Sequence, residues 1–269
     1  MLLCSAGAEF ALPPGMGQTT MMSMVAQVDK LVYRDPSIYA GLARCREFPS
    51  LGDLLAARDV KRVLDVGCGD GRHLAYLRSL CILGAGVDAA PALCVEARAV
   101  NPDATILEGD ALEAELGSGY DAVLCLGSTL QYWTTNEELD LILGRMRDAL
   151  SPGGLLVLDL NNFGELLEAR VFRRVSVKNH TVDCRQLKEK LELQIDAHQQ
   201  VVLAEWQWLL EGEEQPFRDR SAYRILLPQE TRKFLESQGY TDVTFPDIEF
   251  AAGFREIDGS RLVVTARKR

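Results

Sequence analysis

A glycine-rich turn directly after a short apolar run constrains the fold of this chain more than any other feature. Residues 63–73 read Val-Leu-Asp-Val-Gly-Cys-Gly-Asp-Gly-Arg-His. Glycines at alternate positions let the backbone turn tightly from a strand into a helix and approach a ligand without side chains in the way. Asp88 closes the next apolar run, where its carboxylate can accept hydrogen bonds from ribose hydroxyls. The pattern therefore predicts a nucleotide-like ligand at the carboxyl end of a parallel sheet.

The middle of the chain alternates short apolar runs with helical patterns. The apolar runs predict strands over 63–66, 82–88, 104–107, 122–126 and 155–160. Helices are predicted over 91–100 and after Thr135, which forms a capping box with Glu138. Near-continuous apolar strands separated by helices are typical of a parallel sheet covered on both faces. We therefore expect a doubly wound α/β domain.

The pattern changes after residue 162. In residues 171–227, apolar and polar residues alternate over long stretches, as in half-exposed antiparallel strands. The pattern next predicts a helix over 228–238 and closing strands over 243–245 and 262–266. Near the other end of the chain, the stretch 24–48 predicts one or two helices that break at Asp35-Pro36. We expect a disordered extension over 1–22 and an N-terminal helical lid over 23–58. The core is expected over 59–165 and 228–269, and an antiparallel insertion that covers the substrate over 166–227.

Charge and cysteine usage argue against several classes of function. The chain has 29 Lys and Arg against 39 Asp and Glu, a net charge of −10, and shows no basic cluster. Nucleic acids and anionic membrane surfaces both attract basic segments, so we expect neither as a partner. No apolar stretch approaches the roughly 18 residues that span a bilayer. The seven scattered cysteines form no Cys-x-x-Cys pair, which favours reduced thiols in the cytoplasm over disulfides or a metal site.

Two ligand chemistries compete for the glycine turn. A dinucleotide fingerprint places its third glycine at position 72, where this chain has Arg72. A pyrophosphate would also be repelled by Asp65 and Asp70. S-adenosylmethionine has no phosphate and carries a sulfonium and an amino group, so it suits an acidic, glycine-lined turn. The remaining alternative is a purely structural turn in some other α/β protein.

Five motifs, in their order and spacing, resemble the class I S-adenosylmethionine-dependent methyltransferases. They are the turn at 63–71, Asp88, Glu108-Gly109-Asp110-Ala111, the run 121–128 and Leu150-Ser151-Pro152-Gly153-Gly154-Leu155. The resemblance covers residues 60–160 well and implies a Rossmann-like sheet of seven strands with the last strand antiparallel. It also implies S-adenosylmethionine as the cofactor, with S-adenosylhomocysteine as its product.

The same resemblance implies roles for particular residues. The glycine turn would hold the methionine part of the cofactor, Asp88 would bind the ribose, and Asp110 would read the adenine amino group beside Ala111. The full set of implied cofactor contacts is Asp65, Gly67, Cys68, Gly69, Arg72, Asp88, Ala89, Asp110, Ala111, Leu126 and Gly127.

The C-terminal part is similar to a narrower group, the small-molecule N-methyltransferases, which include amino-sugar N,N-dimethyltransferases and glycine-type enzymes. The similarity rests on residues 221–224, 228–230, 238–240 and 259–268. Some O-methyltransferases share this layout. We therefore expect methyl transfer to a nitrogen or oxygen of a small metabolite, with nitrogen favoured, by a monomer or homodimer. The alternative is a protein that binds S-adenosylmethionine for regulation or for chemistry other than methyl transfer.

Aromatic and polar residues near the predicted site supply candidates for catalysis and substrate binding. The catalytic candidates are Tyr39, Tyr132 and His180. The substrate-binding candidates are Tyr33, Ser128, Gln131, Trp133 and Arg224. Core packing is the alternative role for the rings, and a salt bridge within the insertion is the alternative for Arg224. None of the three histidines stands out as a general base, and an amine acceptor needs only to be deprotonated.

Overall fold

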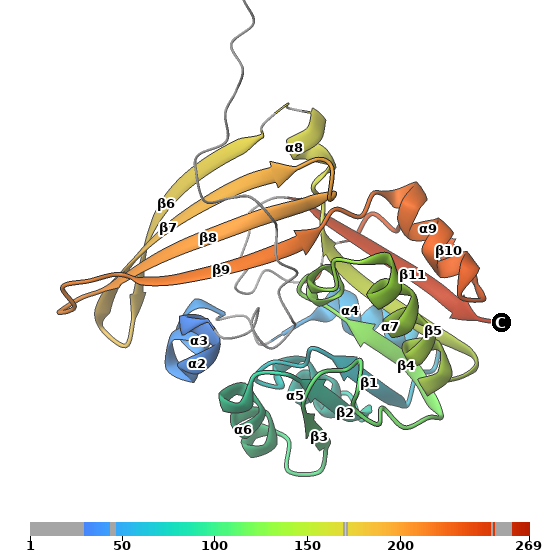
Figure 1. Ribbon diagram of the computed structural model, residues 1–269. Helices are drawn as coiled ribbons and strands as arrows, with labels where there is room; N and C mark the ends of the chain where they lie inside the picture. The colour runs from blue at the N-terminus through green and yellow to red at the C-terminus, as the bar shows by residue number, and fades with distance from the viewer. Residues whose placement is uncertain (1–29, 44–46, 169, 171, 249, 251–259) are drawn as a thin grey trace, which may run out of the picture.

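The computed structural model describes residues 30–43, 47–168, 170, 172–248, 250 and 260–269 (Figure 1). The extension expected over 1–22 and the first part of the expected lid lie outside these residues. No helix in the described part of the chain has both the length and the apolar character needed to cross a membrane.

The core is a seven-stranded sheet in the order β10-β11-β5-β4-β1-β2-β3. Its strands are β1 (Arg62–Val66), β2 (Leu83–Asp88), β3 (Thr105–Glu108), β4 (Tyr120–Cys125), β5 (Leu150–Asn161), β10 (Tyr240–Thr244) and β11 (Arg261–Lys268). Neighbours from β3 to β5 pair in parallel, whereas β11 runs antiparallel to both β5 and β10. The prediction of a doubly wound sheet with an antiparallel last strand is confirmed.

Helices cover both faces of this sheet. They are α4 (Pro49–Ala56), α5 (Arg72–Ser79) and α6 (Pro91–Val100) on one face, and α7 (Asn136–Ala149) and α9 (Pro228–Ser237) on the other. Alternate residues of β1 face opposite layers, since Val63 packs in the cluster of Leu51 whereas Leu64 packs in the cluster of Ile142. Because α4 packs on the sheet, it belongs to the core rather than to the lid that we expected over 23–58.

Two local predictions concern the ends of α7. The expected capping box is present, with the Thr135 side chain accepting from the backbone N–H of Glu138. The Pro-Gly-Gly turn after the helix does not precede β5 but lies inside it as a bulge, because Tyr120 pairs with Leu150 whereas Ala122 pairs with Leu155. The strand therefore starts before the apolar run predicted over 155–160.

The insertion forms a separate antiparallel sheet, as predicted. It contains β6 (Arg173–Val182), β7 (Arg185–Asp196), β8 (Val201–Leu210) and β9 (Phe217–Arg224), in that order, and α8 (Gly164–Glu168) precedes it. Alternation along β7 and β8 buries one face, on which Leu191 lies opposite Trp206.

Two short helices, α2 (Leu31–Arg34) and α3 (Pro36–Leu42), pack against the buried face of the insertion sheet. They separate at Asp35, as predicted, because its side chain accepts from the backbone N–H groups of Ser37 and Ile38 and caps α3. Contacts with β6 and with α6 place them between the insertion and the core (Figure 1). This arrangement brings the lid helices to the carboxyl ends of the parallel strands.

Candidate active site

The glycine turn between β1 and α5 requires glycine. Gly67, Gly69 and Gly71 all have positive φ, of 81°, 54° and 74°, a region that costs other residues about 1–2 kcal/mol. A Cβ at Gly67 would lie 2.4 Å from the Thr129 side chain, and one at Gly69 would lie 2.9 Å from the Tyr39 hydroxyl. The turn therefore passes directly beneath the lid and the loop after β4.

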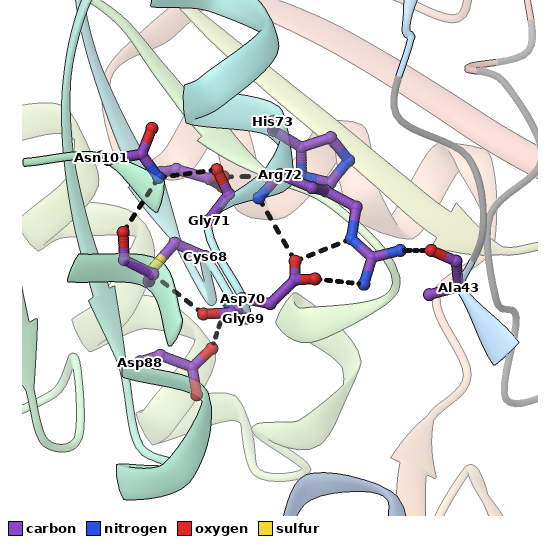
Figure 2. Close-up of polar contacts among 11 residues, drawn as sticks. Ala43, Cys68, Gly69, Asp70, Gly71, Arg72, His73, Asp88 and Asn101 are labelled. Carbon is purple, nitrogen blue, oxygen red and sulfur yellow. Dashed lines mark hydrogen bonds and ion pairs between the residues drawn. The ribbon is translucent and has the colours of Figure 1, made fainter. Parts of the chain in front are cut away.

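Asp88, at the end of β2, is held against this turn. Its carboxylate accepts from the backbone N–H of Gly69 at 2.7 Å (Figure 2) and from that of Ala90 at 2.8 Å. Burial raises its pKa to about 6, against the opposing effect of these two hydrogen bonds. The carboxylate is consequently a fixed acceptor whose charge changes in a mildly acidic range.

Asp65 lies beneath the turn and is fully buried. Neither of its carboxylate oxygens has a hydrogen-bond partner among the described residues, and Nδ1 of the His73 imidazole lies 3.6 Å from one of them. Leaving a buried charge without hydrogen bonds costs several kcal/mol, so proteins keep one where a ligand compensates it. A ligand carrying an ammonium or another positive group would provide that compensation.

Arg72 connects the glycine turn to the lid through hydrogen bonds. Its guanidinium donates to both carboxylate oxygens of Asp70, each at 2.8 Å, and to the backbone carbonyl of Ala43 (Figure 2). It also lies 4.7 Å from the centre of the Tyr39 ring. The residues lining the pocket contain no other Lys or Arg in the described part of the chain. A ligand phosphate would thus meet one guanidinium that is already bound, which disfavours a dinucleotide.

The turn, Asp88 and the lid surround a pocket with about 720 Å³ of empty space, including the part open to solvent. Its walls come from α2 and α3, the glycine turn, the ends of β2 and β3, and the segment after β4. The lining residues are Tyr33, Tyr39, Val66, Gly67, Cys68, Gly69, Arg72, His73, Val87, Asp88, Ala89, Leu93, Gly109, Ala111, Leu126, Gly127, Thr129, Tyr132 and Trp133.

Most of the predicted cofactor contacts line this pocket. They are Gly67, Cys68, Gly69, Arg72, Asp88, Ala89, Ala111, Leu126 and Gly127. Asp65 lies behind the turn, and Asp110 caps its own loop by accepting from the backbone N–H of Leu112 at 2.9 Å. Burial raises the pKa of the Cys68 thiol well above its usual range, so this cysteine is a neutral part of the wall.

Four of the aromatic candidates also line the pocket, Tyr33 and Tyr39 from the lid and Tyr132 and Trp133 from the segment after β4. Tyr132 is the last residue of the 3₁₀ turn η1 (Thr129–Tyr132), and Trp133 follows it directly.

The other predicted substrate and catalytic residues do not line the pocket, because partners elsewhere hold their side chains. Gln131 donates to the backbone carbonyl of Asn161 and accepts from its N–H. Ser128 accepts from the guanidinium of Arg261 at 2.8 Å.

Two candidates within the insertion are held in the same way. Arg224 pairs with Glu230 of α9 at 2.6 Å, so its salt bridge joins the insertion to the core and does not lie within the insertion, as the alternative role assumed. His180 lies 2.7 Å from the buried Glu189 on the neighbouring strand.

Sequence reasoning missed two residues that shape the site. Thr129 packs against Gly67 and follows the fourth-strand motif directly, so its position after Gly127-Ser128 was an available signal. Lys30 lies behind Tyr132, and no local pattern marks it. The described residues contain no group of three or more His, Cys, Asp or Glu arranged to hold a metal ion.

Residues 63–154 match the protein family described as "Methyltransferase domain". We refer to this segment as the methyltransferase domain. It runs from β1 to the bulge of β5 and so contains the glycine turn, Asp88 and the aromatic pair Tyr132 and Trp133. The lid and the insertion lie outside the match. The methyltransferase domain accordingly supplies most of the pocket, and the unmatched segments supply its cover.

Curated relatives align with the same region. A dTDP-3-amino-3,4,6-trideoxy-alpha-D-glucopyranose N,N-dimethyltransferase of Streptomyces venezuelae is 32% identical over 115 residues, which are 42% of this chain and 48% of that protein. A trans-aconitate 2-methyltransferase of Escherichia coli is 29% identical over 131 residues, 47% of this chain and 50% of that protein. The chain thus spans about half the length of the curated relatives it matches.

Solved structures share the complete fold, including the regions outside the methyltransferase domain. The amino pentose methyltransferase CalS10 from Micromonospora echinaspora superposes with a TM-score of 0.68 and 22% identity, covering 88% of this chain and 92% of that chain. The sugar N-methyltransferase KedS8 from Streptoalloteichus has a TM-score of 0.67 and 18% identity over 99% of both chains. At these identities the likeness establishes the architecture.

Proposed function

We propose that this protein transfers a methyl group from S-adenosylmethionine to an amino nitrogen of a small molecule. One observation carries the proposal: the carboxylates of Asp65 and Asp88 flank a glycine-lined turn inside the methyltransferase domain, while the guanidinium at the pocket is bound to Asp70. This wall suits a ligand that combines ribose hydroxyls with positive charge and has no phosphate.

The residues present fit S-adenosylmethionine. Asp88 would accept from the ribose hydroxyls, the glycine turn would contact the methionine part, and the buried carboxylate of Asp65 would compensate its ammonium group. Ala111 would line the adenine ring. When bound, this cofactor supplies an electrophilic methyl carbon on its sulfonium.

The chain's own contribution is to orient the acceptor and exclude water. Methyl transfer is a displacement, so holding the two reactants in line supplies most of the rate enhancement. The rings of Tyr33, Tyr39, Tyr132 and Trp133 form an aromatic wall that attracts a sulfonium or a substrate ammonium by cation–π interaction. The lid helices close the pocket over this wall.

An amine acceptor fits the pocket better than a carboxylate. The trans-aconitate methyltransferases act on a polyanion, which needs cationic side chains to hold it. In the described part of the pocket lining, Arg72 alone carries such a charge, and Asp70 neutralises it. The aminosugar N,N-dimethyltransferases act on amines, and we extend that substrate class to this chain. The net charge of −10 favours a small molecule over nucleic acid. The free thiols suit a cytoplasmic location.

The test combines ligand binding with methyl transfer. Calorimetric titration should show micromolar binding of S-adenosylmethionine and S-adenosylhomocysteine and none of NADH. Mass spectrometry should then detect one or two added methyl groups on a dTDP-linked amino sugar, but none on the matched sugar with a hydroxyl in place of the amine, and none on trans-aconitate. Cofactor binding without transfer to any amine would favour a regulatory binding protein. Absence of binding would refute the proposal.

A further inference from the structure

We propose that Tyr132, held by Lys30, accepts the proton that the substrate amine must lose before methylation. The proposal rests on the function proposed above. It assigns proton transfer to the phenol oxygen of Tyr132, and it makes Lys30 a positioning residue that stabilises the anionic form of that oxygen.

Lys30 is 2% exposed and lies at the start of α2, surrounded by aromatic rings. Its ammonium is 2.7 Å from the Tyr132 hydroxyl and 3.3 Å from the Tyr223 hydroxyl. Four rings surround the ammonium nitrogen, with their centres 4.7–5.6 Å from it. They belong to Tyr33, Tyr132, Trp206 and Tyr223. Burial favours the neutral amine, whereas cation–π attraction to these rings and hydrogen bonds to the two hydroxyls favour the charged ammonium.

The Tyr132 oxygen is the point at which these groups converge. Besides the ammonium of Lys30, the hydroxyl of Tyr33 lies 2.9 Å from it and that of Tyr223 lies 3.2 Å from it. All three groups can donate hydrogen bonds to this oxygen. Because hydrogen bonds and an adjacent positive charge both favour the anionic form of an acid, this environment stabilises the Tyr132 phenolate.

Tyr132 combines this environment with access to the ligand. Both Tyr132 and Tyr33 line the pocket, whereas Lys30 does not. The three tyrosines come from η1, α2 and β9, that is, from the methyltransferase domain, the lid and the insertion. The network therefore assembles only when the cover is folded onto the domain.

Other charged groups near the network are paired. Asp219, on β9, accepts from the backbone N–H of Leu31 at 3.1 Å and lies 4.0 Å from Arg34. Burial raises its pKa, and Lys30 and Arg34 both oppose that shift. On the neighbouring strands, Glu189 is paired with His180 at 2.7 Å.

The proton balance assigns each group a state. An alkylammonium has a pKa near 10, so the acceptor arrives protonated at neutral pH and has no lone pair. Its N–H bond breaks and an O–H bond forms on Tyr132, which converts R–NH₃⁺ and phenolate into R–NH₂ and phenol. The lone pair left on nitrogen is the nucleophile for the methyl carbon, and the methylated product leaves as an ammonium. The phenol of Tyr132 then releases its proton to water.

The first test is a spectroscopic titration of the protein without ligand. The ultraviolet absorbance of tyrosinate should reveal one tyrosine that ionises at least one pH unit below the usual value near 10. That component should be absent from Tyr132→Phe, present in the control Tyr120→Phe, and shifted to higher pH in Lys30→Met. Tyr120 is a suitable control because it lies on β4 beside Arg62 and outside the pocket lining. If Tyr132→Phe removes only an ordinary tyrosine, the proposal is overturned.

The second test is the pH profile of methyl transfer. Tyr132→Phe keeps the ring and should lower kcat by about 10²–10⁴ at neutral pH, with S-adenosylhomocysteine affinity within twofold of the wild type. Its rate should recover at alkaline pH, where the amine loses its proton to water. A profile parallel to that of the wild type would overturn the proposal. A low-pH tyrosinate in a protein that methylates no amine would instead refute the proposed function and leave the network intact. Thermal melting of each variant controls for folding.

Discussion

The carboxylate of Asp88 accepts a hydrogen bond from the backbone N–H of Gly69 at 2.7 Å, which ties the end of β2 to the glycine turn after β1. Residues nineteen positions apart thus form one rigid wall of the pocket. The bond satisfies the backbone donor of Gly69, a residue without a side chain of its own, and it fixes the direction of the carboxylate. We therefore expect ligand recognition at this wall to depend on the charge of the Asp88 carboxylate.

The raised pKa of Asp88 predicts that ligand affinity depends on pH. In the proposed function the ribose hydroxyls donate to the ionised carboxylate, and this group takes up a proton as the pH falls through about 6. S-adenosylhomocysteine should therefore bind about tenfold more weakly at pH 5 than at pH 7. Since the raised pKa means that the folded state holds this proton more tightly, stability without ligand should fall as the pH rises from about 4 to about 6.

Calorimetry across this pH range checks the prediction. Asp88→Asn should bind more weakly at pH 7, and its affinity should change little with pH. Asp53→Asn, which alters an exposed carboxylate on α4, serves as the control and should follow the wild-type curve. A wild-type pH dependence in Asp88→Asn would exclude Asp88 as the titrating group.

Asp65→Asn should stabilise the protein without ligand and impair ligand binding. The substitution keeps the shape of the side chain and removes a carboxylate that accepts no hydrogen bond from the described part of the chain in a fully buried site. We expect a gain of about 1–3 kcal/mol in the free energy of unfolding, measured by urea denaturation. Calorimetry should show at least a tenfold loss of S-adenosylmethionine affinity. A variant that unfolds more easily than the wild type would contradict this view of Asp65.

Gly67→Ala should destabilise the protein more than Gly153→Ala. Both glycines have positive φ, 81° and 73°, so each substitution incurs about 1–2 kcal/mol of backbone strain. At Gly153 a Cβ would meet no atom within 4 Å, whereas at Gly67 it would meet the Thr129 side chain at 2.4 Å. We expect a total loss of about 3 kcal/mol at Gly67, measured by denaturant titration. Equal losses at the two positions would show that the Thr129 contact relaxes freely.

Arg72→Met should loosen the lid. It leaves the buried carboxylate of Asp70 without its bidentate partner and removes the bond to Ala43, at an expected cost of about 3–5 kcal/mol. Hydrogen exchange in α3 should accelerate. Arg173→Met breaks the more exposed pair with Glu192 and should cost at most about 1 kcal/mol. Because Asp70→Asn removes the carboxylate charge that Arg72 balances, adding it should restore part of the stability that Arg72→Met loses. No recovery in the double variant would mean that the pair is not the source of the loss.

The elements that could be predicted from the sequence are those set by local backbone chemistry. The glycine turn, the break at Asp35 and the capping box at Thr135 each depend on residues within four positions of one another. Apolar runs and alternation likewise identified the parallel core and the antiparallel insertion, because their periods reflect burial on two faces or on one. The position of Asp88 at the pocket follows from the same logic, since parallel strands end at one edge of the sheet.

The roles of individual side chains depended on contacts that no local pattern encodes. Gln131, Arg224 and His180 are polar residues that the sequence suggested for the site, yet each is held by a partner outside the pocket. The Lys30–Tyr132 contact joins residues 102 positions apart. Which donor meets which acceptor depends on how the lid and the insertion pack onto the domain. The sequence by itself thus determined the fold and the glycine-lined acidic wall, whereas only the tertiary structure decided which polar groups are satisfied internally and which face the pocket.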